Sequence, residues 1–118
     1  MTVEDPVAYC AGLWDWKILA ECFPGTKIKP TDIDGAVERN YKFLWIETKA
    51  PEVVIPQGQE IFYKRLAKRG DLVLIVWGTT NEPVALRMLY RNAQRDIDPC
   101  DLPRLQEVVT NWFKWANQ

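Results

Sequence analysis

The sequence predicts an α/β fold with a mixed sheet flanked by helices. Apolar residues recur at helical spacing in three segments, and other segments alternate with a period of two. One continuous apolar run, Leu72–Trp77, is typical of a central strand that is buried on both faces. Helical and extended segments alternate along the chain, which favours layers of helix and sheet. With 118 residues, of which 47% are hydrophobic, we expect one domain over residues 1–118.

The first half of the chain predicts a helix and then a hairpin. Asp5 and Pro6 suit an N-cap and a first helical position, so we expect a helix from about Pro6 to Cys22. Its apolar stripe comprises Val7, Ala11, Trp14, Ile18 and Cys22. Two strands are expected to follow, over Thr31–Glu38 and Lys42–Lys49, with Asn40-Tyr41 as a tight turn.

The second half predicts helix, strands and helix. A loop over 51–56 leads into a helix over Gln57–Lys68 that ends at Gly70. The central strand Leu72–Trp77, a turn over 78–83 and a strand Val84–Arg91 come next. A last amphipathic helix begins near Asp101. Its expected core residues are Leu105, Val108, Val109, Trp112, Phe113 and Ala116. The expected order is helix, two or three strands, helix, two strands, helix.

Composition excludes several functions. The chain has no histidine, which removes histidine-based nucleophiles, zinc sites and general bases. Its three cysteines are isolated and suit free thiols in a reducing cytoplasm. No apolar stretch approaches the roughly 20 residues that span a membrane. The net charge of −1 argues against tight DNA binding by the whole surface, but leaves room for a local basic patch or a partner.

The predicted hairpin brings charged residues together. If Asn40-Tyr41 is the turn, Asp34 lies opposite Glu47 on the same face of the sheet. Lys49 shares that face because it is two residues beyond Glu47. Asp32 would lie opposite Lys49, so either Asp32 or Asp34 could be the paired acid.

Two carboxylates at this distance suit a divalent cation. Mg²⁺ or Mn²⁺ would be held by Asp34, Glu47 and the Thr48 backbone carbonyl. The ion would activate water and polarise a phosphate, and Lys49 would assist. The ordinary alternative is a surface hairpin whose charges are merely solvated. The apolar strand that ends in Glu47 argues against that alternative.

These residues resemble the PD-(D/E)XK nuclease superfamily. Asp34 matches the motif aspartate, although Ile33 replaces the usual proline, and Glu47-Thr48-Lys49 matches the (D/E)XK element. Gln59 and Tyr63 fit the Q-x-x-x-Y pattern of the RecB-like branch. The segment from about Pro30 to Trp77 is also similar to small VRR-NUC and Holliday-junction-resolvase-like nucleases of phages and bacteria.

The resemblance implies a restriction-endonuclease-like αβββαβ core and metal-dependent cleavage of DNA, with an endonuclease favoured. It implies that Gln59 and Tyr63 lie over the site and contact water or phosphate. Family members often add an acidic residue from the first helix. Glu21 is the candidate here, and Asp15 and Glu4 are alternatives.

Basic residues on the second predicted helix have two interpretations. Lys64, Arg65 and Lys68 would either complement the helix dipole or hold the DNA backbone. The function also has alternatives. One is a nuclease fold that only binds protein, such as a phage-encoded inhibitor or a complex subunit. Another is a metal-free interaction module with chance motif matches. A homodimer or a partner protein is compatible with each.

Overall fold

The computed structural model describes residues 12–118, which fall into two units divided after Asp32. In the described part of the first unit, the regular element is a 3-10 helix, η1 (Lys17–Cys22), with no buried residue. The predicted α-helix Pro6–Cys22 is therefore wrong over residues 12–22, and its beginning lies outside the described residues. An apolar stripe supports an α-helix only where it can be buried against another element.

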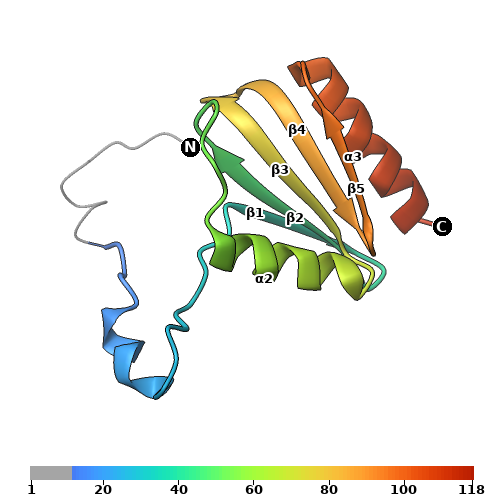
Figure 1. Ribbon diagram of the computed structural model, residues 1–118. Helices are drawn as coiled ribbons and strands as arrows, with labels where there is room; N and C mark the ends of the chain where they lie inside the picture. Colours follow the sequence, from blue (N-terminus) through green and yellow to red (C-terminus); the bar gives the residue numbers. More distant parts are fainter. Residues whose placement is uncertain (1–11) are drawn as a thin grey trace. The chain divides into compact units, whose positions relative to one another are not determined.

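The second unit, Ile33–Gln118, is a five-stranded sheet with a helix on each face (Figure 1). Its elements are β1 (Gly35–Arg39), β2 (Lys42–Lys49), α2 (Gln57–Lys68), β3 (Leu72–Thr79), β4 (Glu82–Tyr90), β5 (Ala93–Ile97) and α3 (Leu102–Ala116). The strand order is β1-β2-β3-β4-β5. Strands β2 and β3 are parallel and the other pairs are antiparallel. The predicted α/β class with a mixed sheet is confirmed, and at the coarse level the arrangement is consistent with an αβββαβ-like core.

Several boundaries differ from the predictions. Strand β1 begins at Gly35 rather than Thr31, and the turn before β4 is confined to residues 80–81. Strand β5 was not predicted, because its sequence Ala-Gln-Arg-Asp-Ile lacks apolar alternation. At the edge of the sheet it pairs through the backbone with β4 alone, so polar side chains are tolerated there.

The β1–β2 hairpin has the predicted register. Asn40 and Tyr41 have φ of 53° and 65°, the left-handed pair that a type I′ turn requires. Pairing runs outward from Arg39 and Lys42 to Gly35 and Ile46. The Asn40 amide donates to the Ala116 carbonyl at 3.0 Å. The turn thereby satisfies a carbonyl at the C-terminal end of α3.

Each face of the sheet has its own apolar core. One face packs against α3, and the other packs against α2. The α3 core contains Leu44, Leu72, Leu74, Val76, Leu86, Cys100, Val108, Trp112 and Ala116. The α2 core contains Ile55, Tyr63, Ala67, Val73, Ile75 and Leu89. Alternate residues of β3 enter alternate cores, which explains its continuous apolar run.

No helix in residues 12–118 combines the length and apolar character needed to cross a bilayer.

Candidate active site

Asp34 lies directly before β1, beside the end of β2. Its Oδ2 accepts hydrogen bonds from the Thr48 backbone N–H at 2.8 Å and from the Thr48 hydroxyl at 2.9 Å. Continuing the β1–β2 register by one residue places Asp34 opposite Glu47. These contacts hold the Asp34 carboxylate against the last residues of β2, beyond the stretch that pairs with β1.

Glu47 is on the face of β2 that α2 covers. Only 5% of its surface is exposed, and its Oε2 accepts a hydrogen bond from the Tyr63 hydroxyl. Tyr63 is fully buried in the middle of α2. A buried carboxylate requires partners, and here the phenol of α2 supplies one. The helix therefore fixes the direction of the Glu47 side chain.

Lys49 stands two residues beyond Glu47 on the same face. Its Nζ donates to the Gln59 side-chain oxygen at 2.7 Å. Gln59 and Tyr63 are four residues apart on α2, so they lie one above the other on one helix face. The two charged residues of β2 therefore each meet one polar residue of α2: Glu47 meets Tyr63, and Lys49 meets Gln59.

The two carboxylates have opposite pKa shifts. Burial raises the pKa of Glu47, and the nearby Asp34 raises it further. Burial also acts to raise the pKa of Asp34, but hydrogen bonds from Thr48 and Glu47 and the charge of Lys49 outweigh it and lower the pKa. As the pH falls, Glu47 is therefore the first of the two carboxylates to bind a proton, and Asp34 stays ionised to a lower pH. Burial, together with the Glu47 carboxylate, also raises the pKa of the Tyr63 hydroxyl, so it remains a proton donor.

The donor set fits a hard divalent cation. Asp34 and Glu47 offer carboxylate oxygens, and repulsion between them is relieved by either a proton or a cation. In an extended strand the N–H and C=O of one residue point to the same side. Because the Thr48 N–H points to Asp34, its carbonyl points to that edge as well. Among the described residues, no cluster of three or more Asp, Glu, Cys or His side chains could hold a metal, so backbone oxygen and water would complete the coordination.

Asp32 does not join this arrangement. Strand β1 begins three residues later, so the predicted pairing of Asp32 with Lys49 is wrong. The Asp32 carboxylate instead accepts a hydrogen bond from the Trp16 indole at 2.8 Å within the first unit. Of the two candidate aspartates, Asp34 is the one that contacts the end of β2.

Other predicted residues lie elsewhere. Glu21 is exposed in η1, in the first unit, and its role stays a prediction. Lys64, Arg65 and Lys68 are exposed in the C-terminal half of α2.

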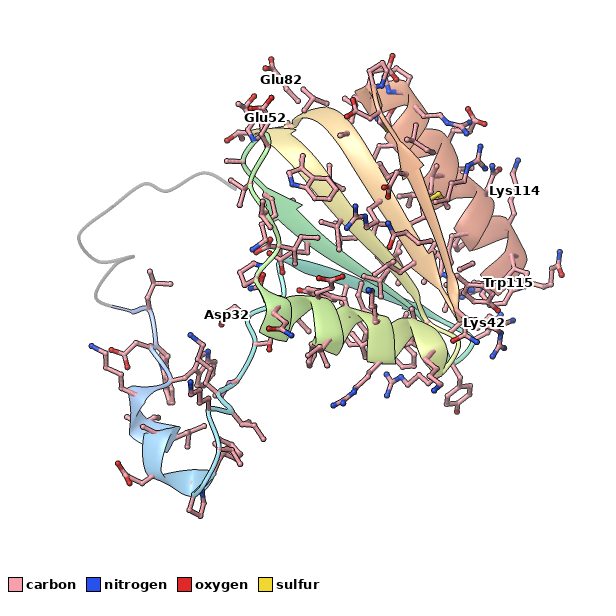
Figure 2. All side chains as sticks on the ribbon, viewed as in Figure 1. Asp32, Lys42, Glu52, Glu82, Lys114 and Trp115 are labelled. Atoms are coloured by element: carbon pink, nitrogen blue, oxygen red, sulfur yellow. The ribbon has the colours of Figure 1, made fainter. Side chains whose placement is uncertain are left out.

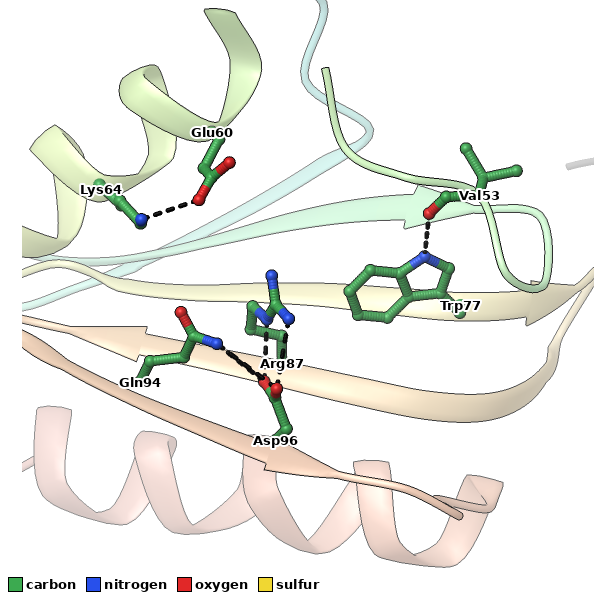
Figure 3. Close-up of polar contacts among 7 residues, drawn as sticks. All are labelled: Val53, Glu60, Lys64, Trp77, Arg87, Gln94 and Asp96. Carbon is green, nitrogen blue, oxygen red and sulfur yellow. Dashed lines mark hydrogen bonds and ion pairs between the residues drawn. The ribbon is translucent and has the colours of Figure 1, made fainter. Parts of the chain in front are cut away.

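Two features near this site were not predicted from the sequence. The Thr48 hydroxyl contacts Asp34 directly, and threonine between the two motif residues was the only signal for it. Further along the sheet, Arg87 of β4 pairs with Asp96 of β5 at 2.8 Å (Figure 3). Asp96 could not be placed because β5 was not predicted.

Comparisons with protein-family models, with curated proteins and with solved structures found no match to this chain. A function for the chain is therefore inferred from the geometry of its residues.

Proposed function

We propose that the chain is a divalent-metal-dependent nuclease that hydrolyses phosphodiester bonds in DNA, with internal cleavage as the expected mode. The observation that supports this proposal is the meeting of Asp34 and Glu47 at one edge of β2, with Lys49 on the same strand. Carboxylates in this arrangement suit a hard cation, and a neighbouring ammonium suits a phosphate.

In the proposed mechanism, Asp34, Glu47 and the Thr48 carbonyl would hold Mg²⁺ or Mn²⁺. A bound ion supplies positive charge that favours deprotonation of the attacking water and offsets charge on the phosphate. Lys49 places an ammonium group beside the carboxylates, where it stabilises negative charge that develops on the phosphate oxygens.

Gln59 and Tyr63 are assigned positioning roles. Each one contacts a charged residue of β2: Gln59 accepts from Lys49, and Tyr63 donates to Glu47. Direct contact of Gln59 and Tyr63 with water or phosphate stays a prediction. A tyrosine that stays protonated orients the carboxylate without competing for the cation.

The first prediction concerns cleavage. Glu47→Gln keeps the size of the side chain and an acceptor for Tyr63 but removes the charge. We expect the rate of plasmid cleavage with Mn²⁺ to fall by about a hundredfold or more, the scale for losing one preorganised electrostatic group. Lys49→Ala should have a similar effect. The matched control is Glu38→Gln, an exposed position on β1, which should cleave at the wild-type rate.

The second prediction concerns the ion itself. Mn²⁺ at about ten times its dissociation constant should stabilise the wild type by about 1.4 kcal/mol, which corresponds to a rise in Tm of roughly 6 °C. Asp34→Asn should remove this rise. If Mn²⁺ leaves the wild-type Tm unchanged and DNA remains intact, the metal-dependent nuclease is rejected and the protein-binding alternative is favoured.

A further inference from the structure

A second feature of α2 lies away from the carboxylates. A hollow of about 350 Å³ opens between the C-terminal half of α2 and the β4–β5 turn. It is lined by Lys64, Arg65, Ala67, Lys68, Leu89, Arg91, Asn92, Ala93 and Gln94. Four of these residues are cations and none is acidic. A chain with a net charge of −1 thus concentrates positive charge at one place.

Most of this charge is not neutralised by the part of the chain that the structure describes. Lys64 pairs with Glu60 at 2.7 Å but remains 55% exposed. In residues 12–118, no carboxylate oxygen lies within ion-pair distance of Arg65, Lys68 or Arg91. Figure 3 shows Glu60 and Lys64 on α2 on the side that faces Gln94 of β5. All four cations are exposed to solvent, and three of them have no carboxylate partner in the described part of the chain.

Arg91 is held in place by its surroundings. Its backbone N–H donates to the Ala67 carbonyl at 2.7 Å, which fastens the β4–β5 turn to α2. Its guanidinium group lies 5.3 Å from the centre of the Tyr90 ring and packs against Gly70, where an added Cβ would come within 3.4 Å of Arg91 Nη2. An ordered cation loses less conformational entropy on binding an anion than a free one does.

The backbone of Arg91 is set by the tight turn between β4 and β5. Its φ is 53°, a left-handed conformation that asparagine and glycine adopt more easily than arginine. The helix dipole explains basic residues at the end of α2, but it does not explain a strained arginine on a separate turn that converges on the same hollow.

We infer that this hollow binds backbone phosphates of the nucleic-acid substrate, with Lys68 and Arg91 as the principal contacts and Lys64 and Arg65 beside them. The inference rests on the proposed function. From Gln59 to Lys68, α2 rises about 13.5 Å at 1.5 Å per residue. That length corresponds to about four base-pair steps of duplex DNA. One helix would therefore align the cleavage site with phosphates a few nucleotides away.

The test is the salt dependence of DNA binding, measured by fluorescence anisotropy on a labelled duplex in EDTA, so that no divalent ion supports cleavage. The double variant Lys68→Gln, Arg91→Asn should bind about tenfold or more weakly at about 0.1 M salt. The slope of log Kobs against log salt should become shallower by about 1.8, at about 0.9 per lost phosphate contact. Arg91→Asn suits the left-handed turn, so the Tm should not fall because of the backbone.

The matched control removes two cations from the other face. Arg95 pairs with Met88 on the side of α3, and Lys114 is exposed on α3 (Figure 2). Arg95→Gln, Lys114→Gln changes the net charge by the same amount and should leave the slope nearly unchanged. An equal loss in both double variants would overturn the inference, because it would indicate a general charge effect.

Two further outcomes separate this inference from the nuclease. If the wild type cleaves DNA but the hollow variant keeps the wild-type slope, the phosphate site is rejected and the nuclease stands. If the wild type does not cleave but the slope falls only in the hollow variant, the site stands and the catalytic proposal fails. Millimolar inorganic phosphate should compete weakly with the duplex, since several cations spread over a helical turn suit a polyanion. Strong competition would indicate a small-anion site instead.

Discussion

At the scale of single residues, burial and a neighbouring carboxylate shift the pKa of Glu47 in the same direction. Both raise its pKa above the ordinary value of 4.5. A carboxyl group whose pKa is raised in the folded state favours folding below its unfolded pKa. That contribution is lost as the pH rises through the folded value. At neutral pH, ionised Glu47 therefore destabilises the protein in the absence of a cation.

This gives a prediction for stability and pH. In EDTA at pH 7, Glu47→Gln should raise the Tm by about 4 °C, the scale of roughly 1 kcal/mol in a domain of this size. The gain should disappear below about pH 4.5, where both proteins carry a neutral side chain at this position. Thermal melts at pH 4 and pH 7 would check it. A variant that melts lower than the wild type at pH 7 would contradict the proposed electrostatic cost.

At the scale of elements, the hairpin and α2 together assemble the site. The turn at Asn40-Tyr41 sets the register that places Asp34 opposite Glu47, and α2 supplies Tyr63 and Gln59. Tyr41 has φ of 65° and is 93% exposed. The left-handed conformation of Tyr41 is therefore energetically unfavourable, and its exposed side chain makes too few packing contacts to offset that cost.

Tyr41→Gly should consequently stabilise the hairpin. Glycine adopts this conformation without steric penalty, and we expect the Tm to rise by about 3 °C. Ala36→Gly in the extended part of β1 is the matched comparison, and should lower the Tm because glycine weakens a strand interior. The Tyr41 prediction fails if both glycines lower the Tm equally.

Many of the helices and strands were predictable from the sequence. The bounds of β2 and α2 match because period-two and period-3.6 patterns are followed by clear stops at Pro51 and Gly70. Strand β5 was not predictable from a polar edge sequence. The helix Pro6–Cys22 was expected from an N-cap signal and from apolar periodicity, and neither says whether a surface exists to bury the stripe. The choice between Asp32 and Asp34 needed the first residue of β1, and strand ends are poorly marked in sequence.

At the scale of the whole molecule, the sheet, both flanking helices and the proposed metal ligands Asp34, Glu47 and Thr48 all belong to residues 33–118. A variant that begins at Ile33 should therefore fold cooperatively. It should also retain the rise in Tm with Mn²⁺ that the full chain is expected to show. Calorimetry of both proteins would measure this. Loss of the Mn²⁺ effect alone would implicate an acidic residue of the first unit, with Glu21→Gln in the full chain as the next comparison.

The alternation of side chains along β2 and β3 has a consequence for engineering. Residues that contact α3 and residues that surround the acids lie on opposite sides of the same strands. Heat resistance could therefore be improved by redesigning the interior beneath α3, for instance around Trp112, whose buried indole N–H has no acceptor in the described chain. The chemistry on the reverse side would be left in place, because the backbone of a paired sheet resists displacement.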